Sequence, residues 1–122
     1  MTRPIPIFLD GDPGHDDAIA WMLTQASPLL DIRGVSSVCG NQTIEKTTWN
    51  ARRVMTLLGI RAPLAQGRKG PLVAEPMPAP GIHGESGLDG PALPEPAGGP
   101  VDLPACGLMA RVLAGGPEPV TL

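Results

Sequence analysis

Short apolar runs alternate with longer segments of helical periodicity along the first half of the chain. These runs lie at about Ile5–Leu9, which is rich in β-branched residues, Ile32–Val38 and Pro63–Gln66, and each is as short as a strand. Between them, the segments at about Asp16–Gln25 and Ile44–Leu58 repeat apolar residues at helical spacing. This order predicts an α/β fold with a mostly parallel sheet and flanking helices.

The two predicted helices differ in how their apolar residues are spread. Those of the first helix are dense enough to predict burial on much of its surface: Ala18, Ile19, Trp21, Met22 and Leu23. Those of the second helix form one face, and Gly59 is typical of a C-terminal stop: Ala51, Val54, Met55 and Leu58. Within the second strand, Gly34 predicts a close approach of another group to the backbone.

The segment from Gly67 to Pro104 has a different character, because 17 of its 38 residues are Gly or Pro. Such a composition predicts irregular structure and slightly favours disorder over a lid or binding loop. One stretch inside it, Ile82–Pro91, combines a histidine, two acidic residues and three glycines. We therefore expect residues 67–104 to form a loop region that contains a flexible active-site flap.

The last part of the sequence predicts one more helix and one more strand. The helix covers about Ala105–Leu113, and Pro119–Leu122 has the pattern of a buried strand that is only beginning. A domain does not usually stop at the start of a core strand. We therefore expect residues 1–122 to be the N-terminal part of a single, longer domain, so that the chain is truncated.

Composition excludes several classes of function. The net charge of −3 and an aromatic content of 2% argue against a nucleic-acid partner. No apolar run approaches the roughly 20 residues of a membrane span, and the N-terminal run is too short for a signal peptide, so the expected location is the cytoplasm. Cys39 and Cys106 have no metal-ligand spacing and are expected to be buried free thiols rather than a disulfide.

The most informative polar feature is a group of four aspartates directly after the first strand: Asp10, Asp12, Asp16 and Asp17. In a parallel sheet this strand-to-helix turn lies at the carboxyl edge, where ligands bind. Carboxylates packed so closely repel one another, so a folded chain is expected to neutralise them with a cation. Acidic oxygens without several Cys or His residues suit Ca²⁺ or Mg²⁺ rather than zinc.

Other interpretations of the aspartates remain open. Acidic residues at a helix start are commonly caps and dipole partners, which would account for Asp16 or Asp17 but not for Asp10 or Asp12. An EF-hand loop does not fit, because its twelfth position would be Trp21 instead of a bidentate Glu. A D-x-D phosphotransferase of the haloacid dehalogenase type is a closer alternative, although its usual Thr or Val after the second Asp is here a Pro-Gly pair.

Three motifs together resemble the inosine–uridine-preferring nucleoside hydrolases. They are the D-x-D-P-G-x-D-D block at Asp10–Asp17, the G-N-Q-T turn within Val38–Thr43 and the I-H-G-E-S-G-L-D-G-P loop at Ile82–Pro91. The resemblance implies a nucleoside hydrolase-like sheet with a Rossmann-like start. It also implies hydrolysis of the N-glycosidic bond of ribonucleosides, to ribose and a free base, at a bound Ca²⁺.

The resemblance assigns roles to six positions. Asp12 and Asp17 would be Ca²⁺ ligands, with Asp12 also taking a proton from the attacking water, and Asp10 would support the metal site by ligation or hydrogen bonding. Asp16 would bind a ribose hydroxyl. Asn41 would face the ribose or the water, and His83 would lie in the loop near the nucleobase, which makes Asp12, Asn41 and His83 the candidate catalytic residues.

The same resemblance implies that part of the family's machinery lies outside these residues. Asp12 and Asp17 supply about half of the oxygens that Ca²⁺ requires, and no general acid for the leaving base is evident. We therefore expect the isolated chain to bind Ca²⁺ weakly and to turn over little or no substrate. A non-catalytic remnant that binds metal or nucleoside is the alternative, purine or pyrimidine preference stays open, and a homo-oligomer is possible in this family.

Overall fold

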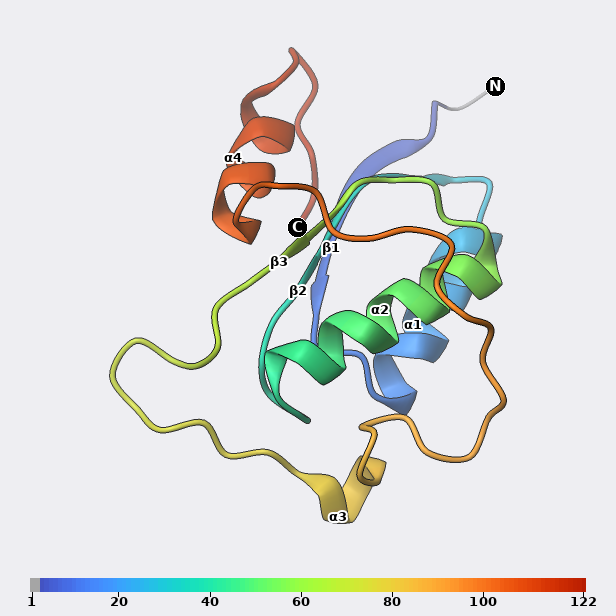
Figure 1. The fold of residues 1–122 in the computed structure, drawn as a ribbon. Coiled ribbons are helices and arrows are strands. Elements are labelled where there is room, and N and C mark those ends of the chain that lie inside the picture. Colours follow the sequence, from blue (N-terminus) through green and yellow to red (C-terminus); the bar gives the residue numbers. More distant parts are fainter. Residues whose placement is uncertain (1–2) are drawn as a thin grey trace.

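A computed structural model describes residues 3–122, in which strands and helices alternate as the sequence predicts (Figure 1). The three strands predicted in the first half of the chain and the three predicted helices are found, with bounds that differ from the prediction by a few residues at most. The elements are β1 (Ile5–Gly11), α1 (His15–Ala26), β2 (Leu30–Ser37), α2 (Ile44–Leu58), β3 (Leu64–Gln66), α3 (Pro80–His83) and α4 (Ala105–Ala114).

The three strands form one parallel sheet in the order β1-β2-β3, which confirms the predicted parallel α/β class. Next to β1, Thr121 forms a parallel bridge with Ile7. The amide of Phe8 donates to the carbonyl of Thr121 at 2.8 Å, and the amide of Thr121 donates to the carbonyl of Pro6 at 2.9 Å. The prediction of a buried strand at Pro119–Leu122 is therefore only partly right. The pairing exists, but Leu122 is 67% exposed, because nothing in residues 3–122 covers it.

Gly34 has the close neighbour that the sequence predicts. The pairing of β1 with β2 skips one residue after Ile7, so that Phe8 lies opposite Gly34. A Cβ atom on Gly34 would lie 2.6 Å from the Phe8 ring, which is closer than van der Waals contact allows. The absence of a side chain at this position lets the ring, which is 2% exposed, pack directly on the sheet.

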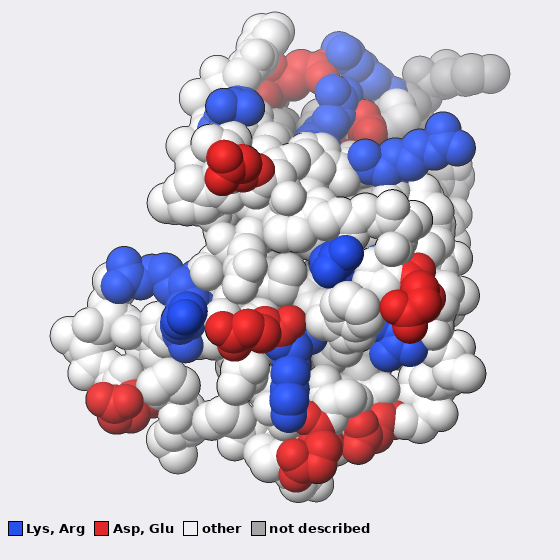
Figure 2. All heavy atoms as spheres, viewed as in Figure 1, with Lys and Arg blue, Asp and Glu red and all other residues white. Residues whose placement is uncertain are grey.

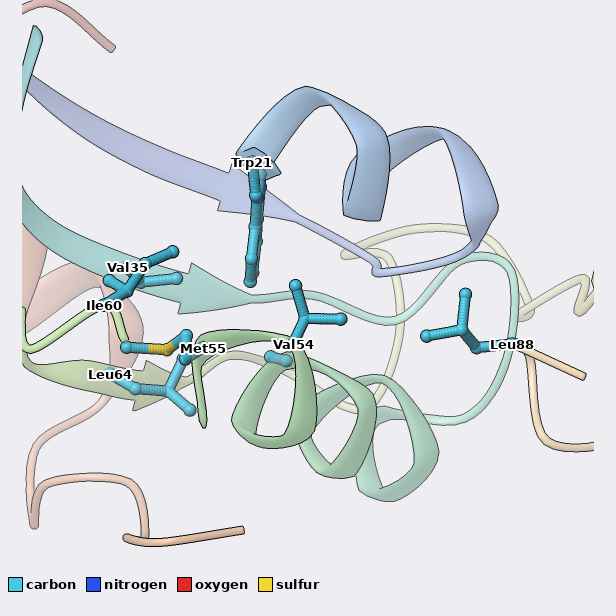
Figure 3. Packing of buried hydrophobic residues seen from close by; sticks show 8 residues of the cluster. Trp21, Val35, Val54, Met55, Ile60, Leu64 and Leu88 are labelled. Atoms are coloured by element: carbon cyan, nitrogen blue, oxygen red, sulfur yellow. The ribbon is translucent and has the colours of Figure 1, made fainter. Parts of the chain in front are cut away.

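The sheet is covered on both faces, which gives three layers. Helices α1 and α2 cover one face, and their core includes Trp21, Val35, Val54 and Leu64 (Figure 3). Helix α4 covers the other face over a smaller cluster built around Phe8. Because strands with both faces covered are buried, the carboxyl edge of the sheet is the open end at which side chains can meet a ligand.

Helix α1 is less buried than its composition predicts. Only Trp21 is buried, whereas Ile19, Met22 and Leu23 are 55%, 44% and 69% exposed. One side of this helix packs on the sheet and α2, and these three side chains lie largely outside that contact. By contrast, the predicted face of α2 is confirmed, with Ala51, Val54 and Met55 buried, and Gly59 ends that helix in the left-handed conformation with φ of 67°.

The cysteines and the surface give three further findings. Both cysteines are free, as predicted, but they are not buried: Cys39 is partly exposed and Cys106 is exposed. Basic and acidic side chains are interspersed on the face shown in Figure 2. Within the described range, none of the helices combines the length and apolarity that crossing a membrane would require.

Candidate active site

The candidate site lies where the carboxyl ends of β1 and β2 meet. Strand β1 ends at Gly11 and is followed by Asp12, and strand β2 ends at Ser37 and leads into the turn that contains Asn41. The amide of Val38 donates a 2.9 Å hydrogen bond to the carbonyl of Gly11, which keeps the two chain segments together past the last strand pair. The topology thus brings the first two sequence motifs to one place.

Asp12 and Asn41 are joined by two hydrogen bonds. The backbone amide of Asn41 donates to Oδ2 of Asp12 at 2.6 Å, and the side-chain Nδ2 of Asn41 donates to the Asp12 carbonyl at 2.9 Å. A Cβ atom on Gly40 would overlap the Asp12 carboxylate, so the turn needs glycine there. Since Nδ2 of Asn41 is engaged, its Oδ1 is the atom with acceptor capacity for a ligand hydroxyl.

Asp17 reaches back from the first turn of α1 to the same point. Its Oδ2 accepts a 2.9 Å hydrogen bond from the backbone amide of Asp12. Burial raises the pKa of the Asp17 carboxyl, and the nearby charges of Asp12 and Asp16 add to this, whereas the hydrogen bond from Asp12 lowers it. The ionised pair of Asp12 and Asp17 is therefore electrostatically unfavourable without a positive partner.

This environment fits a hard divalent cation. The carboxylates of Asp12 and Asp17 lie close together in space, and that of Asp17 is partly buried. They provide the oxygen donors that Ca²⁺ prefers. Residues 3–122 contain no group of three or more His, Cys, Asp or Glu side chains arranged to hold a metal ion. The donor chemistry fits, but two carboxylates alone give Ca²⁺ only part of its shell of six to eight oxygens.

Asp10 and Asp16 lie beside this pair rather than within it. Asp10 is exposed, and its Oδ1 accepts a hydrogen bond from the hydroxyl of Ser36 on β2. Asp16 is exposed in the first turn of α1, where its charge acts on Asp17. The structure therefore brings Asp12, Asp17 and Asn41 together, and the supporting roles of Asp10 and Asp16 stay predictions.

His83 comes to the site from the third motif. It is the last residue of the short helix α3, which the sequence analysis treats as loop, and the start of this helix is tied to the site because Ala79 donates to the carbonyl of Asn41 at 2.9 Å. A Cβ atom on Gly14 would lie 2.6 Å from Nδ1 of His83 and 2.8 Å from Nδ2 of Asn41. His83 and Asn41 are thus neighbours across Gly14.

The loop after His83 is folded on itself. The Asp89 carboxylate accepts hydrogen bonds from the backbone amides of Glu85 at 3.0 Å and Ser86 at 3.1 Å, and from the Ser86 hydroxyl. These bonds hold the pKa of Asp89 below its ordinary value, with the Ser86 hydroxyl as the largest cause. Leu88 is 4% exposed and belongs to the core. The predicted flap is therefore anchored through a buried side chain.

Four polar residues that the sequence analysis missed hold this loop. They lie on one stripe of α2 and the turn before it, and each donates to a backbone carbonyl of residues 84–94: Gln42 to Gly84, Lys46 to Glu85, Asn50 to Ser86, and Arg53 to Leu93 and Pro94. Their spacing of four, four and three residues is that of one helix face. This polar periodicity was the signal that could have identified them.

Asn50 is the most buried of these donors and carries a testable prediction. It is 1% exposed, and its Nδ2 donates to the carbonyls of Ser86 at 2.9 Å and Pro13 at 3.2 Å. Asn50→Ala leaves both carbonyls without this donor, and we expect the free energy of unfolding to fall by about 1–3 kcal/mol in urea denaturation. Gln25→Ala, which removes an exposed amide, should change it by less than about 0.5 kcal/mol. Equal effects of the two substitutions would contradict the anchoring role.

The comparisons with known proteins agree with the motifs. Residues 7–122 match the family described as inosine-uridine preferring nucleoside hydrolase. The chain is 53% identical to the pyrimidine-specific ribonucleoside hydrolase RihA of Salmonella newport over 119 residues, which are 97% of this chain and 38% of that protein. It is 54% identical to the protein of the same name from Photobacterium profundum, over 100% of this chain and 39% of that protein.

The fold is also shared with solved structures. A plant nucleoside hydrolase superimposes with a TM-score of 0.85 at 27% identity, covering 97% of this chain and 38% of that one. The chain thus spans somewhat more than a third of the length of the relatives it matches. Because the family match covers nearly the whole sequence, the chain belongs to the inosine-uridine preferring nucleoside hydrolase family.

Proposed function

We propose that this chain carries the metal- and ribose-binding part of an enzyme that hydrolyses the N-glycosidic bond of ribonucleosides. The observation that carries the proposal is the convergence of Asp12, Asp17 and Asn41 at the carboxyl edge of the sheet. Pyrimidine ribonucleosides are the proposed substrates, because the relatives with 53–54% identity are named pyrimidine-specific.

Ca²⁺ is the proposed cofactor, with Asp12 and Asp17 as its carboxylate ligands and Asp10 as a supporting residue. Bound there, the ion would supply a site for water and for the ribose hydroxyls and would lower the pKa of the water. The raised pKa of Asp17 supports this assignment, because a cation offsets both the burial of the carboxylate and the neighbouring negative charges.

Asp12 is the proposed general base. Its Oδ2 accepts a hydrogen bond from the Asn41 amide, which fixes the carboxylate while leaving Oδ1 able to accept a proton. As water oxygen bonds to the anomeric carbon, its proton passes to Asp12 and the bond from that carbon to the base nitrogen breaks. The leaving base keeps the electron pair, and the positive charge that builds on the sugar is stabilised by the carboxylates.

The remaining site residues are proposed to hold the substrate. Asn41 offers Oδ1 to a ribose hydroxyl or to the attacking water, and Asp16 offers its exposed carboxylate to a ribose hydroxyl. His83, beside Asn41, is proposed to face the nucleobase. Exact placement of these groups matters because orienting the reactants removes much of the entropic part of the barrier.

A chimera tests the function without depending on the length of the chain. In it, this chain replaces the aligned segment of the Salmonella relative, and ribose release from uridine, cytidine and inosine is followed by a reducing-sugar assay. We expect hydrolysis of uridine and cytidine, and a loss of about 10²–10⁴-fold in kcat/KM when Asp12→Ala removes the base. Asp102→Ala, an exposed carboxylate far along the chain, is the matched control and should leave kcat/KM unchanged.

The alternatives give different results in the same experiment. A chimera that folds, binds Ca²⁺ and releases no ribose would favour a non-catalytic binding module. Release of phosphate from nucleotides, without ribose release from nucleosides, would favour the D-x-D phosphotransferase. The 122-residue chain is assayed alongside, and we expect little or no turnover from it because two carboxylates give an incomplete calcium shell.

A further inference from the structure

Asn50 of α2 holds two separate loops of the proposed site with one side-chain amide. Its Nδ2 donates to the carbonyl of Pro13 at 3.2 Å and to the carbonyl of Ser86 at 2.9 Å. Pro13 belongs to the turn of residues 12–14, the metal loop, and Ser86 belongs to residues 83–89, the flap. An amide nitrogen carries two hydrogens, so each of the two carbonyls receives one.

Helix formation and core packing do not account for an asparagine at position 50. Asparagine is a weaker helix former than leucine or methionine and is seldom buried, yet Asn50 is 1% exposed in the middle of α2. An aliphatic side chain of similar size would leave both loop carbonyls without this donor, which destabilises a buried site. The double hydrogen bond is therefore what asparagine contributes at this position.

The metal loop is held at Pro13, between the two proposed Ca²⁺ ligands. Pro13 is buried and directly follows Asp12. The next carbonyl, that of Gly14, accepts a 3.1 Å hydrogen bond from the amide of Ala18 in the first turn of α1. The same turn carries Asp17, whose Oδ2 accepts from the amide of Asp12. A fixed Pro13 therefore helps to fix the two carboxylates relative to each other.

The flap is closed on itself, so it moves as a unit that carries His83. The amide of Asp89 donates to the carbonyl of His83 at 3.1 Å, and the amide of Gly87 donates to the carbonyl of Gly84 at 3.0 Å. Gly84 has φ of 81°, and a Cβ atom there would overlap the Asp89 carboxylate, which binds two amides of the flap. A displacement of Ser86 therefore displaces His83.

The other polar contacts of the flap are weaker links between the two loops. Nδ1 of His15 lies 3.3 Å from Nδ1 of His83, and Nε2 of His15 lies 2.8 Å from the carbonyl of Asp89, but both contacts are exposed to water. Lys46, one turn before Asn50 on α2, donates to a carbonyl of the flap. Within residues 3–122, Asn50 is the buried side chain whose hydrogen bonds reach both loops.

We infer that Asn50 is a positioning residue that fixes the flap, and with it His83, relative to Asp12 and Asp17. The inference deepens the proposed function and depends on it for the roles of those three residues. Asn50 acts through the backbone of the two loops, since both of its acceptors are backbone carbonyls. Loss of its amide loosens both loops together, whereas loss of a donor that holds only the flap loosens only the flap.

Native-state amide hydrogen exchange of the ¹⁵N-labelled chain tests this inference without any measurement of activity. In Asn50→Ala we expect about five- to tenfold faster exchange at two flap amides, Gly87 and Asp89. The same acceleration is expected at Asp12 and Asn41, the site amides, which donate to the carboxylates of the proposed ligands. A merely structural role would accelerate only amides that exchange through global unfolding, by one common factor. Unchanged exchange at the site amides would overturn the inference.

Lys46→Met is the matched control on the same face of α2. It removes a donor to the flap, so any acceleration should be confined to the flap amides, with the site amides unchanged. Acceleration of the site amides in Lys46→Met would contradict the special role of Asn50.

Asn50→Ser provides a second test if Asn50→Ala does not fold. A hydroxyl has one hydrogen, so serine can hold only one of the two carbonyls, and exchange should be faster in at least one of the two loops. A folded Asn50→Ser chain in which both loops keep their protection would contradict the inference.

The chimera connects the exchange pattern with activity. Asn50→Ala is expected to lower kcat/KM for uridine about 10–100-fold, because a displacement of about 1 Å at the reacting groups costs a factor of this order. A chimera that hydrolyses uridine equally well with and without Asn50 would overturn the inference. Failure of ribose release in the unmodified chimera, with the exchange pattern as expected, would contradict only the proposed function.

Discussion

Calcium is expected to raise the melting temperature of this chain, and Asp17→Asn is expected to abolish that rise. A ligand at ten times its Kd stabilises a folded protein by about 1.4 kcal/mol. For a chain of this length that corresponds to an increase of about 4–8 °C. Asp17 is the partly buried carboxylate that reaches Asp12, so removing its charge removes one of the two proposed ligands. The measurement is thermal unfolding, followed by circular dichroism, with increasing Ca²⁺ and with a chelator.

The second part of this prediction concerns the melting temperature of Asp17→Asn when no Ca²⁺ is present. Burial and the charges of Asp12 and Asp16 raise the pKa of Asp17, so its ionised form costs stability at neutral pH when no cation is bound. Asparagine has no charge, and its side-chain oxygen still accepts the hydrogen bond from the Asp12 amide. Without Ca²⁺, Asp17→Asn should therefore melt at the same temperature as the unmodified chain or above it.

A matched control uses another aspartate of the chain. Asp31 lies on β2 with its side chain 42% exposed, and it forms an ion pair with Arg33 at 2.7 Å, away from the site. Asp31→Asn should keep the full response to Ca²⁺, since an exposed ion pair contributes little to stability. A calcium response that survives Asp17→Asn, or one that Asp31→Asn also abolishes, would show that the ion binds elsewhere.

The regular elements could be predicted because their signals are local. The strands are short apolar runs, α2 has an apolar face with the helical period, and Gly59 supplies the left-handed residue at its end. The alternation of these elements was enough to predict a parallel sheet with Asp12 at its carboxyl edge, whereas Asn41 entered the candidate site only through the family resemblance. The short turn between β1 and α1 was enough to predict that Asp17 lies near Asp12.

The parts that could not be predicted depend on contacts between distant segments. Composition favoured disorder for residues 67–104, but the loop is tied down by Leu88 in the core and by donors on α2. The acceptors of those donors are backbone carbonyls, which every residue has, so no residue type in the loop marks the contact. The pairing of His15 with His83 likewise joins positions 68 residues apart, and neither histidine alone indicates the other.

Helix α1 shows why apolar composition overestimates burial, and it gives the second large prediction. Trp21 is 2% exposed and lies between the sheet and α2, beside Val54 (Figure 3). Leu23, two residues later, points to a different side of the helix and is 69% exposed. Trp21→Ala should lower the free energy of unfolding by about 3–5 kcal/mol, because it removes a large buried ring and leaves a cavity.

Leu23→Ala is the matched control in the same helix, and it introduces the same final residue, a strong helix former. Because Leu23 has little area buried in this chain, we expect a change of less than about 0.5 kcal/mol in urea denaturation followed by far-ultraviolet circular dichroism. A loss at Leu23 as large as that at Trp21 would mean that the outer side of α1 is covered, for example by a second copy, and would appear as a dependence of the transition on protein concentration. Equal and small losses at both positions would instead contradict the packing of Trp21 against the sheet, because only a buried ring contributes its full area to the stability of the fold.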